Sequence, residues 1–227
     1  KRVEMVGGKC FTFLANVADA AAMRSLAATI EKEHGVVDVL VNNAGIGAAG
    51  RFLETTLETW RKVFDVNLMG VVHGCHAFLP SMVSRGRGGH VVNLASLAGY
   101  FAAADMPVYA ASKFAVLGFS ESLRADMAAH GIGVTAICPG IIDTGIIAST
   151  ILEGDMGKPG VRDEVQKLYT KRRYTPAQVA EAIVDAVKKN QAVRPVSPES
   201  WAMYYTKRLS PGLAAFLARR QPKTFRQ

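Results

Sequence analysis

The chain has 227 residues, 49% of them hydrophobic, which is enough to bury the core of a single domain. It has no run of about 18 uninterrupted apolar residues and no basic-then-apolar leader, so we expect neither a membrane span nor a secretory signal. The formal net charge of +8 raises the alternative of a nucleic-acid or membrane-surface partner. The basic residues lack interleaved aromatics, which favours a solvated surface; they gather late, in 171–173, 188–189, 207–208 and 219–220.

The three cysteines, Cys10, Cys75 and Cys138, are too scattered for a metal-ligand pattern, so we expect no metal site. Cys10 and Cys138 lie in apolar, strand-like runs, which predicts buried thiols. An odd number of cysteines without pairing signals favours a reducing compartment, so we expect a cytoplasmic protein.

The first predicted elements alternate between strand and helix. Residues 10–15 are apolar and β-favouring, which predicts a strand. Apolar residues at helical spacing follow up to residue 34, with Asp19 as the N-cap and Gly35 as the stop. A short apolar strand over 38–41 comes next.

A long helical region is then predicted over 56–84. Its Gly70 and Gly74 permit close packing, and Pro80 is expected to kink or divide it. The same patterns predict further strands over 90–94, 133–138 and 193–196, and helices over 107–130 and 176–189.

Two segments stand outside this alternation. Residues 141–174 are rich in glycine and irregular, which is typical of a lid or binding loop for the substrate. Residues 197–227 form a C-terminal helical extension, with a helix over 201–220 that is broken at Pro211–Gly212. Packing or oligomerisation is the favoured role of this extension, and a membrane-surface helix is the alternative.

Alternating strands and helices are typical of an α/β protein with a parallel sheet. The strands are apolar on both sides, as expected when helices cover both faces. We therefore predict one Rossmann-like domain over residues 1–227, with a doubly wound sheet in a three-layer αβα arrangement. Ligands of such folds bind at the carboxyl ends of the strands. The segments that directly follow predicted strands are Asn16–Val17, Asn42–Gly45, Ser96 and Pro139–Thr144.

Tyr109 and Lys113 lie four residues apart on the predicted helix 107–130, so they share one face. A tyrosine with an ordinary pKa of about 10 is a poor base at neutral pH. A neighbouring ammonium favours the phenolate; lowering the pKa by about three units requires roughly 4 kcal/mol. The pair is a candidate general acid/base, although the spacing also suits a half-buried tyrosine beside a solvated lysine.

Several motifs occur in one order: Val41–Gly45, Asn67, Ser96, Tyr109 with Lys113, and Pro139–Gly140 with Thr144. Their order and spacing resemble the short-chain dehydrogenase/reductase family over about residues 10–196. The resemblance implies a nicotinamide-dependent oxidoreductase that interconverts a carbonyl and a secondary alcohol.

By this resemblance Tyr109 is the acid/base, and Lys113 lowers its pKa and hydrogen-bonds the nicotinamide ribose. Ser96 holds the substrate oxygen and stabilises charge that develops on it. Asn67 holds a water that links Lys113 to bulk solvent, at a local distortion of its helix.

The resemblance also implies which residues surround the two ligands. The family usually has an aspartate where Asn16 stands, so the adenine contact is expected to differ. The implied cofactor contacts are Asn16, Val17, Asn43, Ala44, Gly45, Tyr109, Lys113, Pro139, Gly140, Ile142 and Thr144. The implied substrate contacts are Ser96, Leu97, Tyr100, Met106 and Ile146, with Phe101, Ile141 and Ile147 nearby.

Most of the residues around the reacting centre are apolar, and none is an arginine that would clamp a carboxylate. This favours a hydrophobic ketone or alcohol over a sugar or an acyl-carrier substrate, although core packing explains part of the pattern equally well.

One part of the family pattern is absent. The family begins with a strand, a TGxxxGxG turn and a helix, and Gly7–Gly8 does not replace that turn because a predicted strand follows it. We expect the chain to start inside the second helix of the fold. Three explanations are open: a unit outside these residues, a truncation, and a natural loss. We favour the first, because losing a central strand would expose a large apolar edge. The residue that separates NAD from NADP falls in that part, so both stay open, with NADP preferred.

We therefore expect a cytoplasmic NAD(P)-dependent oxidoreductase without a nucleic-acid partner. By the resemblance it forms a homodimer or homotetramer through the helices over 56–84 and 107–130. Two alternatives remain: a non-catalytic dinucleotide-binding or scaffold protein of the same fold, and a basic nucleic-acid or membrane-surface protein.

Overall fold

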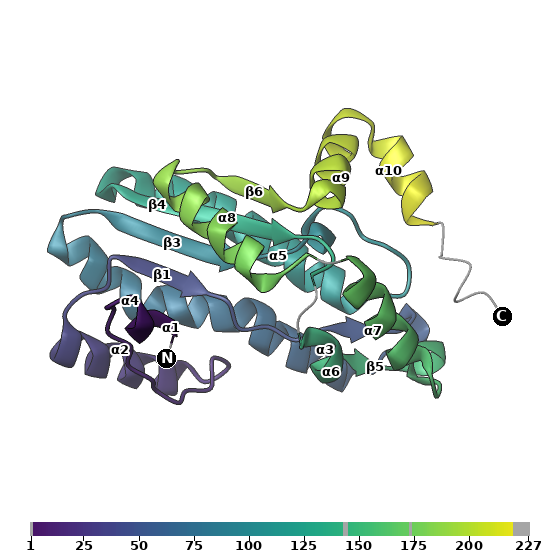
Figure 1. Cartoon of the computed structure of the whole chain (residues 1–227), viewed down its shortest axis with the longest axis horizontal. Coiled ribbons are helices and arrows are strands. Elements are labelled where there is room, and N and C mark those ends of the chain that lie inside the picture. The colour runs from purple at the N-terminus through teal and green to yellow at the C-terminus, as the bar shows by residue number, and fades with distance from the viewer. Residues whose placement is uncertain (1, 143–144, 173, 220–227) are drawn as a thin grey trace.

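A parallel four-stranded sheet forms the centre of the computed structural model, which describes residues 2–142, 145–172 and 174–219 (Figure 1). The strands lie in the order β1-β3-β4-β6. Their bounds are Val39–Asn42 for β1, Gly89–Leu94 for β3, Ile132–Pro139 for β4 and Val193–Val196 for β6. The register pairs Val41 with Val92 and Val92 with Thr135, so the carboxyl ends of the central strands meet at one edge.

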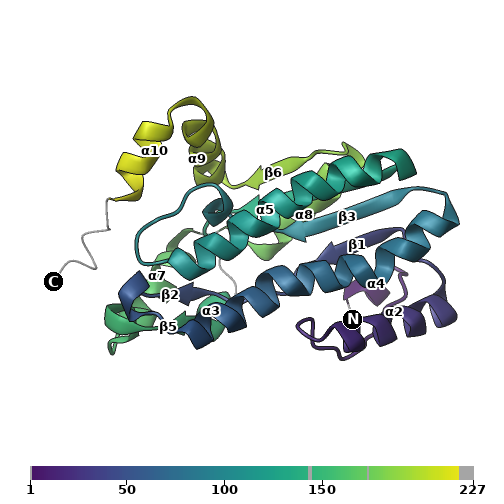
Figure 2. The ribbon, with the colours of Figure 1, turned by 180° about the vertical axis from the view of Figure 1, so that it is seen from behind.

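Helices cover both faces of this sheet, which confirms the predicted α/β three-layer fold. Helices α4 (Gly70–Arg85) and α5 (Pro107–Met127) lie on one face, and α2 (Ala20–His34) packs against α4 (Figure 2). Helix α8 (Pro176–Lys188) lies on the other face, against β4 and β6. Of the buried apolar clusters, one lies between the sheet and helices α4 and α5, and another lies between the sheet and α8.

The helical region predicted over 56–84 is present as one continuous run, and a π-helical segment lies within it. It consists of α3 (Leu57–Phe64), a π-helical segment (Asp65–Met69) and α4. Pro80 lies inside α4, which continues past it to Arg85, so Pro80 does not divide the helix. The run Leu57–Arg85 is long and apolar enough to cross a membrane, with a mean hydropathy of 1.2. It nevertheless packs against α2, α5 and β1, as a core helix does.

The strand predicted over residues 10–15 is wrong. These residues are irregular, because the described part of the chain has no strand beside them to complete their backbone hydrogen bonds. Phe11 stacks on His34 instead, with ring centres 3.9 Å apart. Cys10 is exposed, against the prediction, whereas Cys75 and Cys138 are buried. A short helix, α1 (Arg2–Met5), precedes this segment.

Residues 145–172 are more regular than predicted. The segment contains α6 (Ile146–Ser149), β5 (Ile151–Leu152) and α7 (Val161–Arg172). Strand β5 pairs in parallel with β2 (Ala48–Ala49), which joins the segment to the loop after β1. Short 3-10 turns complete the fold at Phe52–Glu54, Leu97–Gly99, Ala128–His130 and Gly154–Gly157.

The predicted C-terminal helix with a break is present as two helices. These are α9 (Pro198–Leu209) and α10 (Pro211–Ala218), and Ser210 separates them. In both ribbon views the pair lies beyond the end of β6, and α10 is the outer of the two helices (Figures 1 and 2).

Gly70 and Gly74 allow α4 to approach its neighbours closely, as predicted. A Cβ on Gly70 would lie 2.9 Å from Cγ2 of Val17, and one on Gly74 would overlap Oδ1 of Asn42. The Asn42 amide is held in place because its Nδ2 donates to Oδ1 of Asn93 at 2.9 Å. The contact between α4 and β1 therefore needs a residue without a side chain at position 74.

We predict that Gly74→Ala lowers the free energy of unfolding by about 1–3 kcal/mol, because the added methyl group overpacks this contact. Gly118→Ala is the matched control, since Gly118 is exposed on α5 and an added Cβ meets nothing within 4 Å. Better helix propensity should make that variant more stable by up to about 1 kcal/mol. Urea unfolding of both variants measures the difference, and effects of the same sign would contradict the packing argument.

Candidate active site

A cavity of about 820 Å³ opens at the carboxyl ends of the strands. Asn43 and Gly45 follow β1, Ser96 follows β3, and Gly140 follows β4, and all four residues line this cavity. The segments that follow β1, β3 and β4 thus meet at one rim of the sheet, as expected for a doubly wound fold.

Tyr109 and Lys113 lie in the first turns of α5 and face the same cavity. The Nζ atom of Lys113 is 5.8 Å from the centre of the Tyr109 ring and donates to the Leu94 carbonyl oxygen at 2.8 Å. Ser96 follows β3, and its side chain hydrogen-bonds with Tyr109. The end of a strand and the start of a helix therefore bring the three predicted catalytic side chains together.

Asn67 is fully buried in the π-helical segment. Its Oδ1 accepts from the Ile46 amide at 2.8 Å, and its Nδ2 donates to the Ile46 carbonyl at 3.0 Å and to Oγ of Ser112 at 3.1 Å. Ser112 in turn donates to the carbonyl oxygen of Tyr109 at 2.8 Å. The predicted helix distortion at Asn67 is present, and it directs the amide toward both the loop after β1 and α5.

Burial dominates the electrostatics of the tyrosine and the lysine. It raises the pKa of Tyr109 to about 12, although the hydrogen bond with Ser96 opposes this shift. It lowers the pKa of Lys113 to about 8, although the nearby Cys138 opposes that shift. The chain by itself therefore holds Tyr109 in its protonated form, and the phenolate needs positive charge beyond that of Lys113.

The nicotinamide end of a dinucleotide fits the residues at this rim. A Cβ on Gly45 would lie 3.2 Å from Oδ1 of Asn67 and 3.5 Å from Nζ of Lys113, so the loop backbone passes very close to the lysine. Within the described residues, the Leu94 carbonyl is the only hydrogen-bond acceptor of Lys113. The ammonium has three N–H groups, so two are available for ligand hydroxyls.

The other predicted cofactor contacts divide into three groups. Pro139, Gly140 and Ile142 line the cavity with Asn43 and Gly45. The described lining of the cavity does not include Asn16, Val17 or Ala44. The side chain of Asn16 accepts from the Ala18 amide, and the carbonyl of Val17 contacts the His73 ring. Thr144 lies outside the described residues.

Most of the predicted substrate contacts line the cavity, and one does not. The residues that line it are Ser96, Leu97, Met106 and Ile146, with Phe101, Ile141 and Ile147. Tyr100 is the exception: its ring is buried, and its hydroxyl donates to the Ser200 carbonyl at 2.9 Å. The expectation that Tyr100 contacts the substrate is therefore corrected, because its hydroxyl is hydrogen-bonded to α9 instead.

Helices α7 and α8 supply a wall of the cavity that the sequence did not reveal. Tyr169 lies in this wall, and its proximity adds to the rise in the pKa of Tyr109. Apolar residues at helical spacing in 161–172 were the available signal for α7, but the glycines before it made the whole segment look irregular. The wall residues are Val165, Leu168 and Tyr169 from α7 and Val179, Ala180 and Ile183 from α8.

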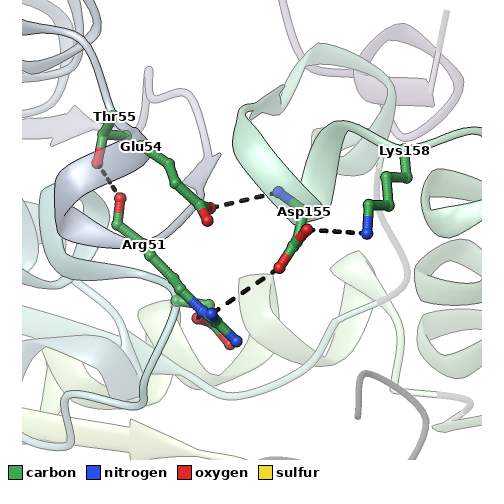
Figure 3. Close-up of polar contacts among 6 residues, drawn as sticks. Arg51, Glu54, Thr55, Asp155 and Lys158 are labelled. Carbon is green, nitrogen blue, oxygen red and sulfur yellow. Dashed lines mark hydrogen bonds and ion pairs between the residues drawn. The ribbon is translucent and has the colours of Figure 1, made fainter. Parts of the chain in front are cut away.

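Ion pairs and hydrogen bonds fasten the outer edge of the cavity (Figure 3). Asp155 pairs with Lys158 at 2.9 Å and with Arg51 at 3.9 Å, and its amide donates to Glu54 at 3.3 Å. Lys158 lowers the pKa of the Asp155 carboxyl, chiefly through their hydrogen bond. This network joins the loop after β2 to the turn between β5 and α7, and Met156 of that turn lines the cavity.

The comparisons with known proteins identify the family of the chain. The family model for short chain dehydrogenases matches residues 1–153. The chain belongs to the short-chain dehydrogenase/reductase family, whose members are NAD(P)-dependent oxidoreductases.

Particular relatives show how far the similarity extends. The "Probable oxidoreductase EphD" of Mycobacterium tuberculosis is 46% identical over 209 residues, 90% of this chain but only 35% of that protein. The 2-(R)-hydroxypropyl-CoM dehydrogenase of Xanthobacter autotrophicus is 38% identical over 174 residues, 75% of this chain and 67% of that protein. A short-chain dehydrogenase/reductase from Burkholderia phymatum, solved in complex with NAD, has a TM-score of 0.82 and 28% identity, covering 97% of this chain and 82% of that one.

We predict a specific pH dependence for Lys113→Met. Lys113 is only 5% exposed, and its folded pKa of about 8 lies below the value of about 10.4 for an unfolded lysine. The unfolded chain therefore binds more protons between these two values, and raising the pH stabilises the folded wild type. The stability of the wild type should rise by up to about 3 kcal/mol relative to the variant across this range.

Urea unfolding at several pH values between about 7 and about 10.5 measures this difference. Lys62→Met is the matched control, because Lys62 is exposed on α3, and its difference from the wild type should stay flat. A flat difference for Lys113→Met as well would show that the ammonium carries no burial penalty.

Proposed function

We propose that the chain interconverts a carbonyl group and a secondary alcohol on a hydrophobic substrate, with NAD or NADP as the cofactor and Tyr109 as the acid/base. The observation that carries the proposal is the convergence of Tyr109, Ser96 and Lys113 on one largely apolar cavity. A protein that only binds a dinucleotide has no need of a half-buried tyrosine hydrogen-bonded to a serine in that place.

The residues divide the chemistry between them. The bound nicotinamide would supply or accept the hydride. Ser96 would hold the substrate oxygen beside the Tyr109 hydroxyl and stabilise negative charge on it. Tyr109 would donate its proton in the direction of reduction and accept one in the direction of oxidation. Lys113 would bind the ribose with its remaining N–H groups and favour the phenolate.

Asn67 would act behind these groups. Its amide fixes the Ile46 backbone and, through Ser112, the first turn of α5 that carries Tyr109. A water near Lys113 would return protons from bulk solvent, as the family resemblance implies. This role keeps Asn67 out of contact with the substrate.

The walls of the cavity support a hydrophobic substrate. Apolar side chains come from four separate segments, and among the described residues the cavity lining includes one basic residue, Lys113. A carboxylate or phosphate group in this space would lose its hydration without gaining a dedicated charged partner. A ketone or alcohol with a hydrocarbon body suits these walls better.

We predict that Tyr109→Phe lowers turnover by about a hundredfold to ten-thousandfold, the usual contribution of a general acid/base. Tyr205→Phe is the control, because Tyr205 is an exposed tyrosine on α9 and should leave turnover unchanged. Cofactor binding, followed by thermal shift with NAD and NADP, should persist in both variants. Retained turnover in Tyr109→Phe refutes its role, whereas cofactor binding without turnover of any carbonyl by the wild type favours the scaffold alternative.

We also predict that kcat/KM rises along a series of methyl ketones of increasing chain length. Each buried methylene group contributes about 0.8 kcal/mol, so each should raise kcat/KM by up to about fourfold until the cavity is full. A matched series that ends in a carboxylate should be much poorer at each length. Equal rates along both series would contradict a hydrophobic substrate and leave the role of Tyr109 untouched.

A further inference from the structure

The C-terminal helix α10 exposes large apolar side chains and lies beyond the end of β6 (Figures 1 and 2). Its residues, Pro211–Ala218, are all apolar or glycine, and Ala214 is the buried one. Leu213 and Phe216 are 48% and 51% exposed, and Leu209, just before the break, is 83% exposed. We call Leu209, Leu213 and Phe216 the α10 patch.

Basic side chains surround the α10 patch. Lys207 and Arg219 flank it and are exposed, and Arg208 lies 4.3 Å over the ring of Tyr204. Between Pro198 and Arg219 the sequence has one acidic residue, Glu199, which is occupied in accepting the Ile141 amide at 3.0 Å. The residues that follow in the sequence include Arg220, Lys223 and Arg226 and no acid.

The helix before the patch, α9, carries aromatic side chains. Trp201 and Tyr205 stack with ring centres 5.8 Å apart, and Tyr205 is exposed. Apolar residues flanked by lysine and arginine, with tryptophan and tyrosine beside them, are typical of helices that lie in the interface of an anionic bilayer.

We propose that the α10 patch docks on the surface of an anionic lipid bilayer. A nucleic acid would use the basic residues but not the exposed Leu213 and Phe216. A second copy of the chain would bring like charges together around the same patch. An anionic bilayer accepts both features, because Lys207 and Arg219 meet headgroups while the apolar side chains enter the acyl boundary.

The α10 patch lies next to the rim of the cavity. The Ala218 carbonyl at the end of α10 accepts from the Ala104 amide at 3.2 Å, and Ala103 and Ala104 line the cavity. Docking would therefore bring the rim toward the lipid. If the proposed function holds, a hydrophobic ketone dissolved in the bilayer would reach Tyr109 through this side; the docking itself does not depend on that function.

Co-sedimentation with vesicles tests the docking without any measurement of turnover. The wild type should bind vesicles of phosphatidylcholine with added phosphatidylglycerol, and more weakly as salt is raised. Leu213→Glu with Phe216→Glu should reduce binding at least about tenfold. Lys207→Gln and Arg219→Gln should each reduce it by about fivefold, and only with phosphatidylglycerol present.

The matched control is Leu53→Glu with Leu57→Glu, an exposed apolar pair outside the α10 patch, at the 3-10 turn after β2 and the start of α3, with exposures of 93% and 72%. This pair should leave vesicle binding unchanged. Because a charge could unfold α10, Leu213→Ser with Phe216→Ser provides a second test, with circular dichroism confirming that the helix content is kept.

Three results overturn the proposal. The wild type fails to bind either kind of vesicle, or the control pair weakens binding as much as the patch variants do. Alternatively, the patch variants change the oligomeric state in the absence of lipid while the wild type binds no vesicles, which would make a second copy of the chain the occupant. Turnover of ketones in solution is unaffected by any of these results, so failure of the docking is distinct from failure of the proposed function.

Discussion

The side-chain amide of Asn67 is the constraint on which the geometry of the site depends. A regular helix would carry position 67 past the loop after β1, whereas the π-helical segment directs its amide to both backbone groups of Ile46. The same amide reaches Ser112 and, through it, the Tyr109 carbonyl. One buried side chain in the π-helical segment therefore fixes both the loop after β1 and the first turn of α5. A buried amide whose polar atoms are all hydrogen-bonded holds such an arrangement rigidly.

The rigidity has an electrostatic consequence. Lys113 is a buried cation with one carbonyl partner among the described residues, and Tyr109 is a half-buried phenol with a raised pKa. Neither state would persist in a site that could relax or admit water freely. The chain thus holds Tyr109 in its neutral form and lowers the pKa of Lys113. The balance between phenol and phenolate is therefore set by the charge of the ligand that binds beside the two side chains. In the proposed function, this arrangement would couple proton transfer to the presence of a cofactor.

The sequence predicts well what is encoded locally. Asp19 and Gly35 mark the ends of α2, and Ser96, Tyr109 and Lys113 follow from spacing and motif order. It predicts poorly what depends on distant neighbours. Residues 10–15 have the composition of a strand, but a strand needs a partner strand, which the described chain does not offer. Tyr100 adjoins the motif serine, yet its direction is decided by Ser200, a hundred positions away. The cavity wall from α7 depends likewise on contacts with α6 and not on local sequence.

The residues proposed for the chemistry and the residues that would select the substrate lie on different elements. The proposed reacting groups, Ser96, Tyr109 and Lys113, follow β3 or stand on α5, and buried hydrogen bonds tie α5 to β3 and to the π-helical segment. The facing wall on α7 is fastened where Arg162 donates to carbonyls of the α6 region, including that of Thr150 at 3.0 Å. The described residues that α7 contributes to the cavity are the apolar Val165 and Leu168 and the phenol of Tyr169. Side chains on α7 can therefore change without moving the reacting groups, so the range of substrates should follow α7 and α8 while the reaction follows the sheet.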